Sequence, residues 1–462
     1  MKRLVILAGA LLAGCALQPT YQRPALPVPG AWPTGAAYGE QPGAGTTPAA
    51  DVGWRNFLTD ARLQRLVEIA LANNRDLRVA ALHVAQVQAQ YRIQRAAQFP
   101  SVDANAELRR TGGSGGATRG YSAGLSAAWE LDFFGRLRSL SDAALQQYLA
   151  SREAQQAFHI LLVSQVTDQY LALLASDELL AVTQRTLQSA QASLQLTQLQ
   201  LRVGAGTELA VRQAETVVEQ AQADQEAQVR ARAQAENALV LLLGEALPAD
   251  LPPVVPFNAQ AFLTDLAAGV PSDLLQRRPD VMQAEAQLRA ANANIGAARA
   301  AFFPSISLTG SLGTASSALS GLFGAGSLAW GFIPSITAPI FNAGQLRAEL
   351  DVAKIEKDIG VAQYEKAIQT AFSEVASGLA ARSTYERQVA ALERLVTASQ
   401  QALDLAQLQF RTGSASYLAV LTEQRNLYGA QQELVQVRLA RMTNLVDLYR
   451  YLGGGWRERT GA

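Results

Sequence analysis

The chain of 462 residues has one cysteine and two histidines, so few of its side chains could act as nucleophiles or soft metal ligands. A single thiol, Cys15, excludes a disulfide and a thiolate metal site within one chain. His83 and His159 each stand alone in a helical pattern, where an isolated histidine is usually a packing or solvated residue. The sequence also lacks a Gly-Lys-Ser/Thr phosphate loop. We therefore expect neither an enzyme nor a bound metal or cofactor.

The remaining chemistry of Cys15 is acylation, because a secretory signal precedes it. Two basic residues lead into the apolar run Leu4–Leu12, which is too short to span a bilayer as a mature helix. The residues Leu12-Ala-Gly-Cys15 resemble the lipobox of bacterial lipoproteins, which implies cleavage after Gly14 and a covalent lipid on Cys15. Ala16 follows, rather than the aspartate that retains lipoproteins in the inner membrane, and this favours the outer membrane. The alternative is an ordinary signal with an incidental cysteine.

Charge and hydropathy narrow the class further. The 39 basic and 39 acidic residues cancel, so no electrostatic footprint for nucleic acid is present. After the signal there is no run of about 18 consecutive apolar residues. Any membrane crossing must therefore be made by strands.

The elements that would position a site occur in two copies, as an internal repeat of the sequence. A heptad seam recurs at an offset of 209 and is followed both times by an Arg-x-Gly turn, at 202–211 and 411–420 (411 − 202 = 209). Phe-Pro-Ser begins a strand pattern in each copy, at Phe99 and Phe303. The seam residues are Leu180, Thr183, Leu187, Ala190, Leu194, Thr197 and Leu201 in the first copy, and Val389, Leu392, Val396, Ser399, Leu403, Ala406 and Phe410 in the second.

Each copy contains a β-hairpin with arms of about ten residues, the length a tilted strand needs to cross a bilayer. Apolar residues alternate along 102–108 and 121–131, and again along 306–312 and 328–336. Between the first two arms, charged residues are expected only beside the loop, at Arg109, Arg110 and Arg119. Pro334 favours an edge position for the last strand. A soluble hairpin with one wet face is the alternative.

After each hairpin we expect a helix of about 65 residues, from near Gly135 to Val203 and from near Gly344 to Phe410. Such lengths indicate a coiled-coil assembly. We divide the chain into a signal at 1–14, a lipidated extended tether at 15–59 with no fold of its own, and a first repeat at 60–244. A Pro-rich linker at 245–272, a second repeat at 273–452 and a C-terminal tail at 453–462 follow.

Four membrane strands cannot close a barrel, and an open sheet edge in lipid leaves backbone groups unsatisfied at several kcal/mol each. Several chains must therefore pool their strands. Two chains would give eight strands and a filled interior, whereas three would give twelve strands and a passage. The expected fold class is mainly α with membrane β, with an internal two-fold repeat.

The sequence resembles the TolC-like outer-membrane efflux proteins, most closely their lipidated, OprM-like branch. The resemblance covers essentially the whole mature chain and rests on the Phe-Pro-Ser strand starts, Leu131-Asp-Phe-Phe-Gly135, Pro339-Ile-Phe-Asn-Ala-Gly344 and the paired Arg-x-Gly turns. It implies a homotrimeric channel whose twelve-stranded barrel continues as a helical barrel into the periplasm. It also implies a periplasmic adaptor and an inner-membrane pump of the RND type as partners, and export of drugs or other small molecules without chemistry of its own.

The resemblance also implies a gate at the periplasmic end, where Gly204 and Gly413 mark turns that face the adaptor. The helix after the second turn would line the constriction, with Leu418 as an apolar ring and Arg425 as a pairing charge. The family commonly has aspartate at the positions of Ala419 or Thr422, and this chain has neither. Either Leu418 and Thr422 form a more apolar constriction, or Glu423 supplies the acidic group. Glu423 and Arg425 could also be simply solvated.

Two other classes of protein compete with the channel interpretation. A lipid-anchored structural coiled coil would explain Cys15 and the heptads, but it leaves two membrane-length hairpins unexplained. A trimeric adhesin would share the coil and the pooled barrel, yet adhesins usually carry one terminal strand domain. We therefore expect a protein anchored in the outer membrane of a Gram-negative bacterium and extending into the periplasm.

Overall fold

The computed structural model describes residues 17–39, 47–113, 116–260, 262–263 and 267–461. The chain divides into two compact units. The strand unit contains residues up to 26, 81–154 and 280–367, and the helix unit contains 27–80, 155–279 and 368–462.

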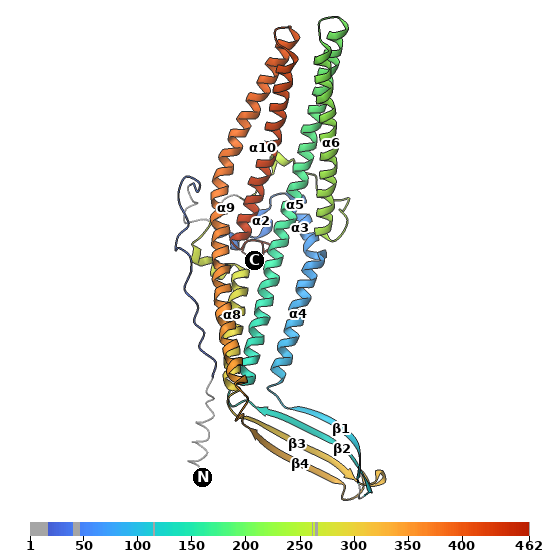
Figure 1. The fold of residues 1–462 in the computed structure, drawn as a ribbon, viewed down its shortest axis with the longest axis vertical. Coiled ribbons are helices and arrows are strands. Elements are labelled where there is room, and N and C mark those ends of the chain that lie inside the picture. Colours follow the sequence, from blue (N-terminus) through green and yellow to red (C-terminus); the bar gives the residue numbers. More distant parts are fainter. Residues whose placement is uncertain (1–16, 40–46, 114–115, 261, 264–266, 462) are drawn as a thin grey trace. The chain divides into compact units, whose positions relative to one another are not determined.

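The helices and strands follow one another in the order expected from the repeat (Figure 1). The first copy consists of α3 (Ala61–Asn73), α4 (Arg75–Ala96), β1 (Ser101–Gly113), β2 (Gly116–Leu131), α5 (Arg136–Arg202) and α6 (Glu208–Leu243). The second consists of α7 (Leu274–Arg277), α8 (Pro279–Ala300), β3 (Ser305–Ser316), β4 (Leu328–Thr337), α9 (Gln345–Arg411) and α10 (Tyr417–Tyr451). Short helical elements lie outside or between these: η1 (Ala49–Asp51), α2 (Trp54–Phe57), η2 (Phe257–Ala259), η3 (Pro271–Asp273) and η4 (Leu319–Gly321).

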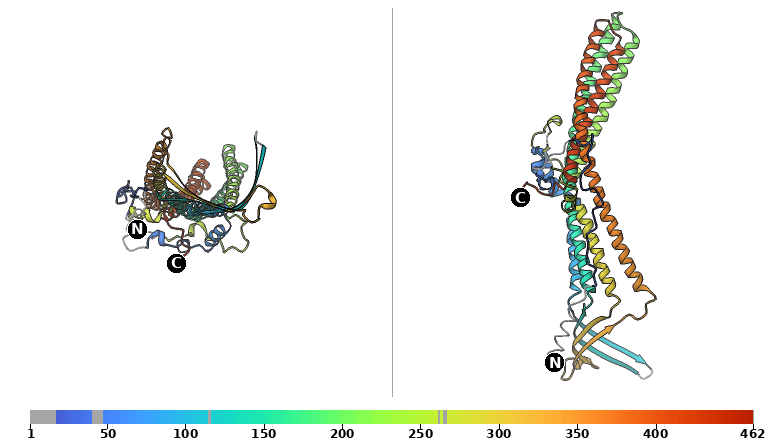
Figure 2. Two further views of the ribbon diagram at one scale, coloured as in Figure 1. Left: turned by 90° about the horizontal axis from the view of Figure 1, so that it is seen from below. Right: turned by 90° about the vertical axis from the view of Figure 1, so that its left-hand side faces the viewer.

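In the strand unit the two hairpins join into one antiparallel sheet of order β1-β2-β3-β4. The register places Ser101 opposite Ala128, and the central pairing places Leu125 opposite Leu312. Figure 2 shows the four strands as one curved sheet. Within the chain, β4 is an edge strand, as Pro334 predicted. Because β1 and β4 have a partner on one side only, the sheet is open at both edges.

The two long helices α5 and α9 each have 67 residues, which confirms the predicted lengths. Each begins just after a glycine in the left-handed region, Gly135 with φ 75° and Gly344 with φ 88°. The start of α5 is capped by Asp132, whose carboxylate accepts from the amides of Leu137 at 3.1 Å and Arg138 at 2.8 Å. These turns let a strand end and a helix begin within a few residues.

In the helix unit the predicted heptad seam is buried between four helix segments. Its residues pack against α6 and α10, and the views of Figures 1 and 2 agree that α5, α6, α9 and α10 run side by side there. Ala190 is 1% exposed. The buried or partly buried seam residues of this cluster are Leu187, Ala190, Leu194, Val396, Leu403, Ala406 and Phe410.

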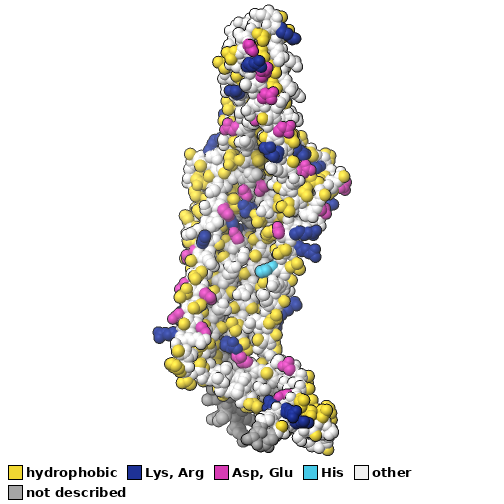
Figure 3. Space-filling model, turned by 45° about the vertical axis from the view of Figure 1, so that its right-hand side comes forward, with side chains coloured by type: hydrophobic (Ala, Val, Ile, Leu, Met, Phe, Trp, Pro, Cys, Tyr) yellow, Lys and Arg dark blue, Asp and Glu magenta, His cyan; other side chains and the backbone are white. Residues whose placement is uncertain are grey.

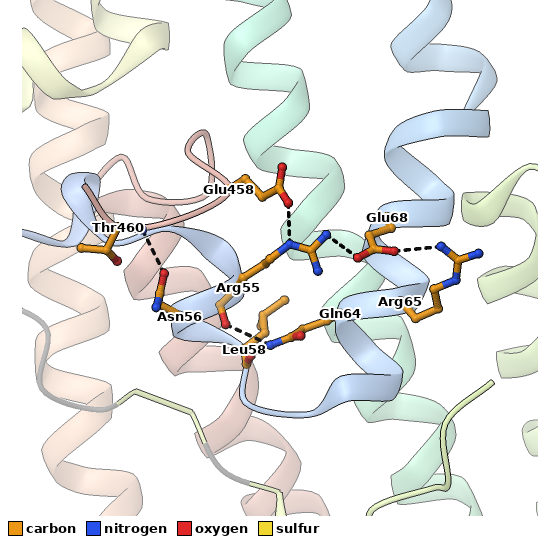
Figure 4. Close-up of polar contacts among 8 residues, drawn as sticks. All are labelled: Arg55, Asn56, Leu58, Gln64, Arg65, Glu68, Glu458 and Thr460. Atoms are coloured by element: carbon orange, nitrogen blue, oxygen red, sulfur yellow. Dashed lines mark hydrogen bonds and ion pairs between the residues drawn. The ribbon is translucent and has the colours of Figure 1, made fainter. Parts of the chain in front are cut away.

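The C-terminal tail packs against α2 in the helix unit. The amide of Trp54 donates to the carbonyl of Arg457 at 2.9 Å. Arg55 lies between two carboxylates, pairing with Glu458 of the tail at 2.6 Å and with Glu68 of α3 (Figure 4). The tail therefore ties the first helices of the unit to the end of the chain.

The segment expected to be a tether is instead seated on the body of the protein. In the helix unit, the indole of Trp32 donates to the carbonyl of Gly269 at 2.8 Å and stacks on Phe372 at 5.1 Å between ring centroids. In the strand unit, Tyr21 and Arg23 both contact Glu285 of α8. The extended conformation of residues 17–39 agrees with the prediction. The prediction did not include these contacts or the short helices η1 and α2 near the end of the segment.

One described helix, α5, contains an 18-residue window long and apolar enough to cross a membrane by length and composition alone. Half of that window is buried within the protein, as in the core helix of a packed bundle. We therefore assign this apolar stretch to packing.

Candidate channel surfaces and gate

The turn between α5 and α6 is a Schellman motif built on Gly204. This residue has φ 77°, a left-handed conformation that costs glycine little. Its amide donates to the carbonyl of Leu201 at 3.0 Å, and the amide of Ala205 donates to that of Gln200 at 2.8 Å. The sequence prediction of a glycine cap is confirmed here.

The turn between α9 and α10 has the same construction. Gly413 has φ 75°, and its amide donates to the carbonyl of Phe410 at 3.1 Å. The amide of Ser414 donates to the carbonyl of Gln409 at 2.9 Å. The long helices of the two copies therefore end in the same motif. Contact of these turns with an adaptor stays a prediction.

Three of the four gate candidates share an exposed face of α10. Leu418 is 56% exposed, and Thr422 and Arg425 are exposed as well. Steps of four and three residues bring all three within about 60° around a helix. The Thr422 hydroxyl donates to the carbonyl of Leu418 at 2.9 Å. This face therefore presents an aliphatic group, a hydroxyl that is already bonded, and a cation.

Glu423 lies away from that face. It stands five residues beyond Leu418, about 140° around the helix. Its side chain is half-buried and accepts from the amide of Asn426 at 3.2 Å. The structure therefore does not bring Glu423 together with Leu418, Thr422 and Arg425.

The opposite face of α10 is fixed by the core of the helix unit. Tyr417, Val420 and Leu421 are buried in the cluster that holds the seam. Gln424 is also buried, and its amide donates to the hydroxyl of Ser193 on α5 at 3.1 Å. Packing on one side leaves the gate candidates facing away from this core.

The equivalent surface of the first copy differs in charge. Leu209 of α6 corresponds to Leu418 at the offset of 209 and is 67% exposed. The positions that correspond to Thr422 and Arg425 are Gln213 and Thr216. Neither of these two α6 positions carries a charge, whereas Arg425 of α10 does.

The sheet has one apolar and one polar face, because residues opposite each other in the register point to the same side. The apolar face carries an aliphatic or aromatic side chain at most positions, although neither face is covered by another described element. Exposed apolar surface of this extent is typical of contact with lipid. Its members include Val102, Leu108, Tyr121, Leu125, Trp129, Ile306, Leu308, Leu312, Leu328, Trp330, Phe332, Pro334 and Ile336.

The opposite face is polar and suits a water-filled interior. Ser307 and Ser335 are bonded across it at 2.6 Å between hydroxyl oxygens. Asp103, Glu107 and Glu130 also occupy this face. The expectation that hairpin charges are confined to the loop is therefore wrong. Charges alternate with apolar residues, so they can enter the barrel strands while staying out of lipid.

Aromatic residues surround the end of the sheet where the helices begin. The indole of Trp129 donates to the carbonyl of Gln98 at 3.0 Å, and Phe134 stacks on Phe303 at 4.7 Å between centroids. Trp and Tyr are enriched at membrane interfaces because one end of the ring system is polar. This end of the sheet is therefore suited to the periplasmic interface.

A buried carboxylate in the strand unit holds the N-terminal segment, and sequence reasoning missed it. Glu285 of α8 is 5% exposed and receives two bonds from Arg23, at 3.0 and 2.8 Å, and one from Arg289 at 2.8 Å. Tyr21 donates to it at 3.1 Å. We call these four residues the Glu285 clamp. Burial alone would raise the pKa of Glu285, but the hydrogen bonds from Arg23 and Arg289 outweigh it and hold that pKa below its usual value.

Two partly buried ionisable groups of the helix unit have strongly shifted pKa values. Burial raises the pKa of Asp168 to about 7, and the negative charge of Asp447 adds to the effect. Burial lowers the pKa of His159 to about 4, and its ring meets Trp456 edge-on at 4.9 Å between centroids. His159 is thus a packed, neutral side chain, whereas His83 is exposed. Cys15, the predicted lipidation site, lies outside the described residues.

The chain matches the model of the family described as outer membrane efflux protein over residues 66–245 and 270–454. The solvent efflux pump outer membrane protein SrpC of Pseudomonas putida is 49% identical over 98% of this chain and 98% of its own length. Outer membrane protein OprJ of Pseudomonas aeruginosa is 46% identical over 98% of this chain and 95% of its own. The open state of the MtrE outer membrane channel of Neisseria gonorrhoeae superposes with a TM-score of 0.88 at 40% identity, covering 97% of this chain and all of that one.

The fold and these similarities agree. The chain is mainly helical with a four-stranded antiparallel sheet, which members of this family pool in threes into a twelve-stranded barrel continued by a helical tunnel. This confirms the fold class expected from the sequence, and the adhesin and scaffold alternatives do not fit it. The chain belongs to the outer membrane efflux proteins, the non-enzymatic outer-membrane channels of tripartite efflux pumps.

Proposed function

We propose that three copies of the chain form a lipid-anchored duct for solvents and antibiotics, fed by an adaptor and an RND-type pump. The proposed cargo follows the relatives that are named for solvent, toluene or antibiotic efflux. The adaptor would meet the turns at Gly204 and Gly413. The periplasmic end would be closed by Leu418, Thr422 and Arg425 when no pump is engaged.

The path of the N-terminal segment supports a lipid on Cys15. Residues 17–23 run along α8 toward its N-terminus, with the carbonyl of Leu17 bonded to Arg299 at 3.1 Å and that of Pro19 bonded to Asn292 at 2.8 Å. Arg299 lies in the last turn of α8, just before β3. The first described residue of the chain is therefore held beside the end of α8 that leads into the strands. Mass spectrometry of the mature protein and of Cys15→Ser tests this anchor.

The single observation that carries the gate proposal is the shared exposed face of Leu418, Thr422 and Arg425. Three symmetry-related copies of this face would bring apolar and cationic groups toward one axis. An apolar constriction excludes water and ions because their desolvation is unfavourable. Glu423, bonded to Asn426 on another side of the helix, is less suited to this role.

Conductance of trimers in planar bilayers tests the gate. We expect Leu418→Ala with Arg425→Ala to increase the leak conductance of the isolated channel. The matched control is Leu209→Ala with Thr216→Ala, the same positions on α6, which should leave the leak unchanged. Equal conductance in the α10 double variant and the wild type would refute the gate. If Glu423→Gln by itself increases the leak conductance, the carboxylate of Glu423 supplies the gate.

A further inference from the structure

Two arginines lie on the apolar face of the sheet, at the end nearest the loop between β1 and β2. Arg110 of β1 and Arg119 of β2 lie directly opposite each other in the register, two positions beyond the Leu108 and Tyr121 pair. Because side chains alternate, Arg110 and Arg119 share the face of those apolar residues. Figure 3 shows Lys and Arg side chains beside apolar ones near the free end of the strands.

Neither arginine has a protein partner among the described residues. Arg109, one position along β1, differs because it points to the polar face and pairs with Glu107 at 3.1 Å. The sequence from residue 305 to 348, which contains β3, β4 and their connection, has no acidic residue. Strands of an adjacent copy of the hairpin β3-β4 therefore offer no counter-charge either.

Like charges directly opposite each other destabilise a sheet, since Cβ atoms of such a pair are only about 4.5–5.5 Å apart. An anion between the two guanidinium groups would remove this repulsion. Phosphate is well matched, because each planar guanidinium can donate two parallel hydrogen bonds to its oxygens. The arrangement therefore fits a phosphate group better than a single carboxylate.

The height of the pair on the sheet identifies the source of that phosphate. Ten residues separate Trp129 at the helix end of β2 from Arg119, which is about 34 Å along a strand. With a strand tilt of about 35–45° this corresponds to roughly 24–28 Å across the membrane, close to the apolar band of about 25 Å in such barrels. When Trp129 lies at the periplasmic interface, Arg110 and Arg119 lie at the outer headgroups.

We propose that Arg110 and Arg119 form a binding site for the phosphate groups of the outer-leaflet glycolipid, one site per chain. The proposal rests on the membrane placement of the sheet. The acyl chains of the lipid would cover the apolar face below, and the phosphate would sit between the two guanidinium groups. The site would anchor the outer rim of the channel to its lipid.

The test is native mass spectrometry of detergent-solubilised trimers titrated with purified bisphosphorylated lipid A. About 1 kcal/mol per arginine near an anionic lipid surface predicts an affinity about fivefold lower for Arg110→Gln or Arg119→Gln and about thirtyfold lower for the double variant. The matched control is Arg109→Gln, a neighbour on the other face, which should bind as the wild type does. Lipid A stripped of both phosphates should bind as weakly to the wild type as intact lipid A binds to the double variant.

Equal lipid binding by the double variant and the wild type would overturn the proposal. So would equal loss in Arg109→Gln, or displacement of the lipid by millimolar inorganic phosphate, which would indicate a site for the free anion. The same spectra report the oligomeric state. Monomers in the wild-type sample would refute the pooled barrel itself, whereas lipid-free wild-type trimers would refute only this site.

Discussion

The Glu285 clamp makes a quantitative prediction about the N-terminal segment. Replacing Glu285 with Gln keeps the shape of the side chain and removes the charge to which Arg23 and Arg289 bond. Charge-assisted hydrogen bonds stabilise by about 1.5–3 kcal/mol each, but Arg23 is 42% exposed and can regain water. We therefore expect the segment to open more easily by about 2–3 kcal/mol, which is about 30- to 150-fold in the open population.

Chymotrypsin cleavage after Tyr21 measures this opening, because a protease needs the segment detached from α8. Trypsin is less suitable, since Pro24 follows Arg23. In the regime where cleavage is slower than reclosing, its rate follows the open population. The control is Glu356→Gln, an exposed glutamate on α9.

Cleavage of Glu285→Gln at the wild-type rate would refute the clamp. Arg23→Gln should have a similar effect, and combining it with Glu285→Gln should add little because both remove one interaction. The pKa of Glu285 lies below its usual 4.5, so the clamp contributes fully above that pH and is lost as the pH falls through the lower value. Wild-type cleavage should therefore accelerate only in acid.

Three further predictions concern the helix unit. Because the pKa of Asp168 is raised, its carboxyl keeps its proton in the folded state between about pH 4 and 7, whereas it loses the proton in the unfolded state. The destabilising effect of Asp168 therefore grows over that pH range. Asp168→Asn should raise the melting temperature at pH 8 but not at pH 4, and the gain in folding free energy at pH 8 should be up to about 4 kcal/mol. Gly413→Ala forces alanine into φ 75° and should lower the free energy of unfolding by about 1–2 kcal/mol. Gly429 lies in mid-helix with open space around it, so Gly429→Ala should raise the free energy of unfolding by about 0.5–1 kcal/mol, measured by denaturation under the same conditions. Arg55→Ala should speed hydrogen exchange at the Thr460 amide about tenfold, because the tail loses its ion pair; unchanged exchange would show that the backbone bonds alone hold it.

Local patterns predicted most of the fold because each pattern is set by a short stretch of chain. The alternation from Tyr121 to Leu131 specifies a strand and its apolar face, and the glycines at 204 and 413 specify helix caps wherever the helices pack. The heptad seam likewise predicted its own burial. Such features depend on backbone geometry and on the period of side chains, both of which a sequence displays.

The clamp and the charge placement could not be predicted for the opposite reason. Arg23 and Glu285 are separated by 262 positions, and proline-rich composition indicates extension without indicating what the chain lies against. Asp103 and Glu107 were missed because a charge in a strand is compatible with membrane crossing only once its face is known. For the gate, helix geometry separated Glu423 from Leu418, but which face meets the axis depends on neighbouring copies.

The open edges of the sheet have a genetic consequence. Because β1 and β4 of one chain each lack an outer partner, every barrel depends on three intact copies of both edges. A variant that folds but carries one defective edge would still be recruited by normal chains. In a cell that makes both forms equally, only roughly one trimer in eight would be wholly normal, so such an allele should act as dominant.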